Sequence, residues 1–158
     1  MRRTEVNADS SDASREQDAA RAWSAMRTLV LDRHDRRAKV AERLGMSFIR
    51  AKALLHLVSE PLTMRELAAA IAIDAPYATV VVDDLERRGL VRRSPHPDDR
   101  RVKVVTLTAS GRRLAGIART ILDEPPPVLE RLSGQDLAAL ARIVSSLVAD
   151  PEAAEQPS

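Results

Sequence analysis

Apolar residues recur at every third or fourth position over most of the chain, which is the spacing of a helix with one buried face. Over residues 14–44 this spacing predicts one long helix, opened by a capping box of Ser14 and Gln17 and stopped by Gly45. The dense charge over residues 32–39 indicates that this helix is either exposed there or interrupted.

Three shorter helices are predicted after Gly45, and each has its own start and stop signals. These signals are caps, prolines and a glycine: Ser47 and Pro61 for the second helix, a capping box of Thr63 with Glu66 for the third, and Asp74, Pro76 and Gly89 for the fourth. About two residues around Ile73 separate the third helix from the fourth, which is the tight spacing of a helix-turn-helix.

The spacing of the apolar residues changes after Gly89, from a helical period to partial alternation. Residues 90–94 and 101–107 read as two short strands, and the turn-rich segment 95–100 between them makes a hairpin. A helix-turn-helix followed by such a hairpin is the order of a winged helix, in which the hairpin is the wing. The predicted fold class is therefore mainly α with a small β-hairpin: a winged helix-turn-helix plus a helical dimerisation region.

Two further helices are expected at the C-terminal end. Thr108 caps one that runs to about Leu122, the prolines 125–127 break it, and Ser133 with Asp136 opens the last. Together with the first helix they present more apolar surface than a winged helix of about 60 residues covers, so we expect a twofold dimer to bury it. Such a dimer also spaces two recognition helices about 34 Å apart, one turn of DNA.

The net charge of +2 hides an uneven distribution. Residues 21–122 contain 20 Lys and Arg against 11 Asp and Glu, and seven basic residues lie between Glu86 and Lys103. A local basic stretch attracts a phosphate backbone, although a solvated surface has the same composition.

Several other chemistries find little support. The chain has no cysteine, only five glycines with no phosphate-binding loop, and three scattered histidines without ligand spacing, so we expect no metal, no cofactor and no catalytic activity. No apolar run approaches the roughly 18 residues of a membrane span, and the N-terminus lacks an apolar signal region. A soluble cytoplasmic protein is expected.

Candidate DNA contacts follow from the winged-helix geometry. The first residues of the fourth helix face base edges, and the wing tip reaches the minor groove, where Asp99 is expected to hold the Arg101 guanidinium. The candidate residues are Thr63, Arg65, Ala75, Pro76, Tyr77, Thr79, Val80, Arg87, Asp99, Arg100, Arg101 and Lys103. Tyr77 could instead pack against the wing, and Arg87 and Arg88 suit the end of a helix on electrostatic grounds alone.

Three segments, Asp83–Val91, Pro97–Arg101 and Leu107–Gly111, together resemble the MarR family of winged-helix regulators. The resemblance implies a homodimer that binds a pseudo-palindromic site, often released by a small aromatic ligand. It places the recognition helix at residues 74–88 and the aspartate–arginine pair of the wing at Asp99 and Arg101. Val80, and Pro76-Tyr77-Ala78 in place of a Ser/Thr-rich triplet, depart from many relatives, so base reading is expected to rely on Tyr77, Thr79 and apolar contacts with thymine methyl groups.

The expected organisation has five parts: a disordered tail at 1–13, a dimerisation helix at 14–46, a winged helix at 47–107, C-terminal dimerisation helices at 108–150 and a flexible tail at 151–158. Effector contacts are assigned to Trp23 and His56, although Trp23 in the core or dimer interface and a structural His56 are the simpler interpretations. The expected function is that of a sequence-specific transcription regulator acting as a repressor. The alternatives are a nonspecific architectural DNA-binding protein and a winged-helix protein-interaction module.

Overall fold

Side-chain caps start two of the three helices of the winged helix, as the sequence predicts; at the third, Ser47 precedes the helix but its side chain makes no capping hydrogen bond, so that predicted cap is wrong. In the computed structural model, which describes residues 5–99 and 101–149, these helices are α3 (Phe48–His56), α4 (Met64–Ile71) and α5 (Ala75–Arg87). Thr63 and Glu66 form the predicted capping box of α4, and the Asp74 carboxylate accepts a hydrogen bond from the Tyr77 backbone N–H at 2.7 Å to start α5. Gly89 follows α5 with a φ of +69°, a conformation that glycine adopts without strain.

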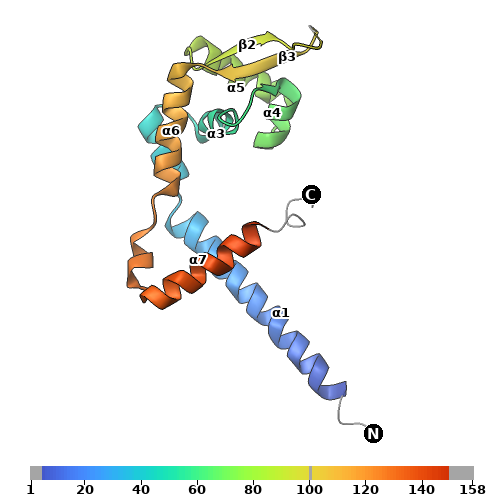
Figure 1. Cartoon of the computed structure of the whole chain (residues 1–158), viewed down its shortest axis with the longest axis vertical. Helices are drawn as coiled ribbons and strands as arrows, with labels where there is room; N and C mark the ends of the chain where they lie inside the picture. Colours follow the sequence, from blue (N-terminus) through green and yellow to red (C-terminus); the bar gives the residue numbers. More distant parts are fainter. Residues whose placement is uncertain (1–4, 100, 150–158) are drawn as a thin grey trace. The chain divides into compact units, whose positions relative to one another are not determined.

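The predicted hairpin is present and gains a third strand. Strands β2 (Val91–Pro95) and β3 (Lys103–Leu107) pair antiparallel, with Val91 opposite Leu107. Strand β1 (Leu62–Thr63) pairs with the other edge of β3, so the order in the sheet is β1-β3-β2. Figure 1 labels the two strands of the hairpin, β2 and β3. β1 is only two residues long, too short for an alternating pattern that would reveal it in the sequence.

The long first helix of the prediction is interrupted in its charged middle. It consists of α1 (Glu5–Arg27), a π-helical segment η1 (Thr28–Arg33) and, after a break, α2 (Arg37–Leu44). In the break the Asp35 carboxylate accepts hydrogen bonds from the backbone and the side chain of Arg37, and this local pairing competes with a continuous helix.

The N-terminal start was predicted wrongly. α1 begins at Glu5, so Ser14 lies inside the helix and does not cap it, and residues 5–13 of the expected disordered tail are helical. Residues 1–4 of that tail, and the C-terminal tail at 151–158, lie outside the described residues. The physical reason is that Ser14 and Gln17 fit an interior helical position as well as a cap when no apolar residue fixes the start.

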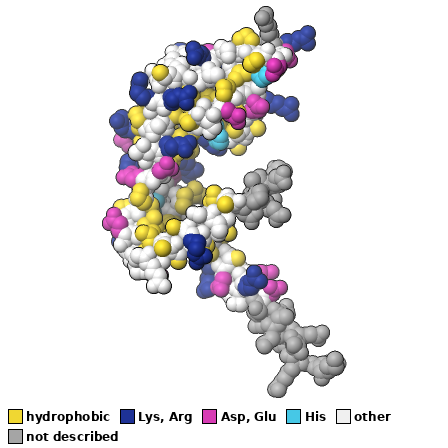
Figure 2. All heavy atoms as spheres, viewed as in Figure 1, with side chains coloured by type: hydrophobic (Ala, Val, Ile, Leu, Met, Phe, Trp, Pro, Cys, Tyr) yellow, Lys and Arg dark blue, Asp and Glu magenta, His cyan; other side chains and the backbone are white. Residues whose placement is uncertain are grey.

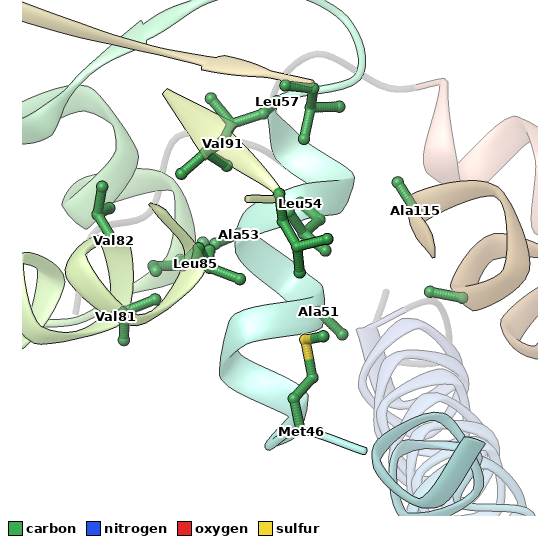
Figure 3. Close-up of a cluster of buried hydrophobic side chains, with 14 of the residues drawn as sticks. Met46, Ala51, Ala53, Leu54, Leu57, Val81, Val82, Leu85, Val91 and Ala115 are labelled. Atoms are coloured by element: carbon green, nitrogen blue, oxygen red, sulfur yellow. The ribbon is translucent and has the colours of Figure 1, made fainter. Parts of the chain in front are cut away.

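One apolar core joins the winged helix to α2 and to α6 (Ala109–Asp123). Figure 3 shows side chains of α3, α5 and α6 meeting in it, among them Leu54, Leu85 and Ala115. The α5 side chains Val81, Val82 and Leu85 are fully buried in this core. The core thereby fixes the back of α5 and leaves its opposite side exposed.

The residues after Asp123 form a separate compact unit with a short 3-10 helix, η2 (Pro127–Arg131), and α7 (Gly134–Val148). The Ser133 hydroxyl accepts a hydrogen bond from the Asp136 N–H at 3.1 Å, which confirms the predicted cap. The expected apolar stripe of α7 is present but not buried within the chain: Leu137, Leu140, Ile143, Val144, Leu147 and Val148 are all exposed, and hydrophobic side chains lie along this helix in Figure 2.

Candidate nucleic-acid interface

The first turns of α5 present a surface that the core does not use. Ala75, Pro76 and Thr79 are exposed, as are Tyr77 and Val80, at 43% and 55%. Ala78, in the same turns, is buried, so these turns have one side in the core and one in solvent. A large aromatic ring and a β-branched side chain left in solvent together indicate a contact surface rather than packing. At 43% exposure the Tyr77 side chain is not buried against the wing, which was the alternative considered for it.

Polar groups next to this surface are partly engaged within the chain. The Thr79 hydroxyl donates to the Ala75 carbonyl at 3.1 Å, which leaves its oxygen as an acceptor and its methyl group for apolar contact. In α4 the Thr63 hydroxyl donates to the Glu66 carboxylate at 2.8 Å. The Thr63 backbone N–H and then this hydroxyl hold the pKa of Glu66 below its ordinary value. Arg65, one residue before Glu66, is exposed.

The wing projects from the sheet, with Arg101 and Lys103 exposed near its tip. Figure 2 shows Lys and Arg side chains beside the wing tip. Asp99 accepts a hydrogen bond from the backbone N–H of Arg101 at 2.9 Å, where the sequence led us to expect the guanidinium as the partner. Asp99 thus shapes the turn and leaves the Arg101 side chain to extend, because a carboxylate readily accepts from a backbone N–H two residues on. Arg100 lies outside the described residues.

The basic stretch between Glu86 and Lys103 divides into two groups. Arg93 pairs with Asp83 at 2.6 Å and with Glu86 at 2.9 Å, joining the root of the wing to α5. Arg87 and Arg88 both bind Asp84, which supports the structural interpretation of these two residues. Arg92, Arg101 and Lys103 make no side-chain ion pair among the described residues and are the ones available to a phosphate backbone.

Asp84 is a site residue that the sequence analysis missed. Its carboxylate is buried, with 7% exposure, and accepts hydrogen bonds from Arg50 at 2.7 Å, from Arg88 at 2.8 Å and from Arg87. Burial alone would raise the pKa of Asp84, but the hydrogen bonds from Arg50, Arg87 and Arg88 outweigh it, so the pKa lies below its ordinary value. The sequence held one signal: Asp84 follows Val81 by three positions and precedes Leu85, on the buried stripe of the helix.

This lowered pKa predicts how stability responds to acid. A carboxyl group whose pKa is depressed by folding stabilises the folded state above its unfolded pKa, here near 3.8, and loses this effect as pH falls through the folded value. We expect Asp84→Asn to be less stable than wild type at pH 7 and the difference to shrink below about pH 4. Chemical denaturation at several pH values measures this, with Asp123→Asn, an exposed aspartate, as the control. A difference that stays constant with pH contradicts the assignment.

The two effector candidates do not share a cavity. Trp23 is 68% exposed on α1, so it is not a core residue of the chain. His56 ends α3, where desolvation and then the Lys52 ammonium keep its pKa below the ordinary value. A cleft of about 700 Å³ between α2 and α6 includes neither of them; it is lined by Lys39, Glu42, Arg43, Ile117, Thr120 and Ile121.

Two absences concern the described residues only. Within 5–99 and 101–149, no three acidic or histidine side chains gather into a group that could hold a metal ion. Among the helices described, none combines the length and apolar content needed to cross a membrane.

An exposed helix start beside a three-stranded sheet with a projecting wing defines a winged-helix protein. The model of the MarR family matches residues 44–102, from the end of α2 through the wing. A curated relative, the HTH-type transcriptional regulator BilQ of Clostridium symbiosum, is 32% identical over 92 residues, or 58% of this chain. The match spans 64% of the length of that relative.

Solved structures agree on the fold. The Staphylococcus aureus MepR–DNA complex is 25% identical with a TM-score of 0.55, over 78% of this chain and 98% of that one. YusO of Bacillus subtilis is 20% identical with a TM-score of 0.63, and the match covers 84% of this chain and 96% of YusO. Apo MarR of Escherichia coli is 21% identical with a TM-score of 0.60, and the match covers 69% of this chain and 83% of that one. Over residues 44–102 the chain matches the MarR family, in line with the resemblance seen in the sequence.

Proposed function

We propose that the chain is a cytoplasmic, homodimeric transcription regulator, acting as a repressor, that binds a pseudo-palindromic DNA site. The observation that supports this most is the pairing of an exposed recognition surface on α5 with unpaired basic residues on the wing. In this proposal Tyr77, Thr79 and Val80 contact base edges and thymine methyl groups in the major groove. Arg65 and the wing residues Arg100, Arg101 and Lys103 contact phosphates and the minor groove.

Two relatives support DNA as the partner. BilQ is described as a transcriptional regulator, and MepR has been solved with DNA bound. The alternative of a protein-interaction module leaves the basic wing unexplained, and a nonspecific architectural protein leaves the exposed Tyr77 and Val80 unexplained, because phosphate contacts need neither.

The domain organisation follows the same proposal. Residues 47–107 form the DNA-binding winged helix, and the helices on either side, over 14–46 and 108–150, form the dimer. The support for the dimer is the apolar stripe of α7, whose members range from 37% exposed at Leu140 to 81% at Val148. A monomer in solution would present this stripe to water, and a second copy of α7 offers the same apolar chemistry.

Release by a small aromatic ligand is proposed on the family resemblance. Trp23 and His56 are the contacts assigned from the sequence. The cleft between α2 and α6, which includes neither of them, is a second candidate ligand site, because it combines isoleucine side chains with charged ones. A ligand that binds there would have to favour one spacing of the two winged helices over another to oppose DNA binding.

The role of the wing is tested with a DNA duplex selected by the wild-type protein from a randomised pool, here called the selected duplex. We expect Arg101→Ala to weaken binding to it by about tenfold and to lower the salt dependence of binding by about one phosphate contact, since one cation leaves the DNA surface. Fluorescence anisotropy at two salt concentrations measures both. Arg119→Ala, which removes the same charge from α6, is the control, and equal effects from the two variants would contradict the wing contact.

A further inference from the structure

One charged residue is buried in the described part of the chain, and it lies on the proposed recognition helix. Asp84 is 7% exposed among apolar neighbours of the core, with Val81 and Leu85 of the same helix fully buried. Removing a carboxylate from water is costly, and a well-packed apolar side chain in such a place is often as stabilising or more so. Stability alone therefore gives no reason for an aspartate at this position.

The hydrogen bonds of Asp84 connect α5 to two other elements. Its Oδ2 accepts from Nε of Arg50 on α3 at 2.7 Å and from Nε of Arg88, just after α5, at 2.8 Å. Arg50 also donates to the Ser47 hydroxyl at 2.7 Å. Arg88 also donates to the carbonyl of Gly45, the residue that ends α2, at 3.2 Å. The cluster of Asp84, Arg50 and Arg88 thus ties the C-terminal half of α5 to the start of α3 and to the end of α2.

These bonds differ in kind from the other contacts on the buried side of α5. Val81, Val82 and Leu85 hold α5 on the core by apolar packing. Such packing resists removal of the helix from the core but fixes the orientation of the helix only weakly, because it is not directional. Charge-assisted hydrogen bonds from two guanidinium groups are directional and fix the orientation of α5 strongly. Tyr77 and Val80 lie one to two turns before Asp84 on the same rigid helix, so a rotation at Asp84 moves them against the DNA.

We propose that Asp84 is a positioning residue for DNA recognition, which holds the exposed surface of α5 at the angle that base contacts require. Arg50 and Arg88 act through Asp84 and do not contact DNA. The inference rests on the proposed function, because it presupposes that α5 reads base edges. It further implies that a displacement of the end of α2 reaches α5 directly, through the bond between Arg88 and the Gly45 carbonyl.

The main test compares Asp84→Asn with wild type on the selected duplex and on a shuffled duplex of the same composition. Asparagine keeps the shape and loses the charge that orders both guanidinium groups. We expect the ratio of the two affinities to fall at least about tenfold, while affinity for the shuffled duplex changes less than about twofold, because phosphate contacts are made elsewhere. Equal losses on both duplexes, or an unchanged ratio, would overturn the proposal. Asp123→Asn removes the same charge from an exposed position and should leave the ratio unchanged.

A second variant keeps the test decisive if Asp84→Asn does not fold. Arg88→Met retains the apolar stem and removes the bonds to Asp84 and Gly45, from a side chain that is 43% exposed. The proposal expects a smaller loss of selectivity, about threefold to tenfold, with no change in the salt dependence, since no phosphate contact is removed. A lower salt dependence for Arg88→Met than for the control Arg119→Met would show that Arg88 contacts phosphate, and would overturn its assigned role.

Hydrogen exchange without DNA separates this inference from the proposed function. In Arg88→Met and Asp84→Asn we expect the amides of α5 to exchange at least about tenfold faster and those of α6 to be unchanged. Unchanged exchange in α5 overturns the positioning role even if the wild type binds DNA selectively. Faster exchange in α5, in a protein whose wild type enriches no sequence, leaves the positioning role intact and contradicts the proposed function instead.

Discussion

Replacing Leu140 and Leu147 with aspartate is expected to convert the protein to monomers and to lower affinity for the selected duplex at least about a hundredfold. Both side chains belong to the apolar stripe of α7, a helix of 15 residues, and both are exposed to solvent. In the proposed dimer they are buried, where two carboxylates per chain cannot be accommodated without a large desolvation cost. A monomer binds one half-site and loses the gain from linking two binding modules, a factor of about 10² to 10⁴.

Sedimentation equilibrium reads the mass, which should fall from twice 17.3 kDa to that of one chain. Ser145→Asp is the control, because it adds one carboxylate, against two in the double variant, to α7 at an exposed position away from the apolar stripe. It should leave both mass and affinity unchanged. A double variant that remains a dimer with normal affinity would show that α7 is not part of the dimer interface.

Gly111→Ala is expected to reduce the free energy of unfolding by about 3 kcal/mol, the upper part of the range for an overpacked core site. A Cβ atom at this position would lie 2.0 Å from the Leu90 carbonyl oxygen, a backbone atom that cannot rotate away. Gly111 is buried in the first turn of α6, where the helix meets the start of β2, and its backbone N–H donates to the Thr108 hydroxyl. The added methyl group must therefore push α6 away from the wing.

Gly116 offers a control on the same helix. Nothing lies within 4 Å of a Cβ built there, and the residue is exposed. Gly116→Ala should stabilise the protein by about 0.5–1 kcal/mol, because alanine loses less conformational entropy in a helix. Denaturant titration of both variants measures these changes in the free energy of unfolding. Equal stability of Gly111→Ala and wild type would mean that α6 and β2 do not approach as closely as described.

Sequence predicted best what is encoded locally. The caps Thr63, Asp74 and Ser133 each bind a backbone N–H about three residues ahead, so a short stretch of sequence contains the whole interaction. The exposure of Tyr77 and Val80 follows from the same helix once its start is fixed and Val81 and Leu85 are assigned to the core. The position of the recognition surface was therefore predictable without tertiary information.

Other features depend on residues far apart in the chain. Asp83 and Asp84 are adjacent and identical in type; helical spacing places Asp84 on the buried stripe, but its partner Arg50 lies 34 positions away and no local pattern identifies it. β1 exists because β3 offers it an edge, 43 positions beyond, as Leu62 pairs with Val105. The start of α1 was misjudged because polar residues such as Ser14 suit a cap, a helix interior and a tail alike.

A competition titration of the wild-type protein tests the central claim most directly. The protein is offered a randomised pool of duplexes, and the enriched sequence is titrated by fluorescence anisotropy beside a shuffled version at two salt concentrations. The account predicts an enriched sequence with two related half-sites about ten base pairs apart, bound about 10³-fold or more tightly than the shuffled duplex at both salt concentrations. Equal affinity for both duplexes, falling steeply with salt, or no binding to either, would contradict sequence-selective recognition.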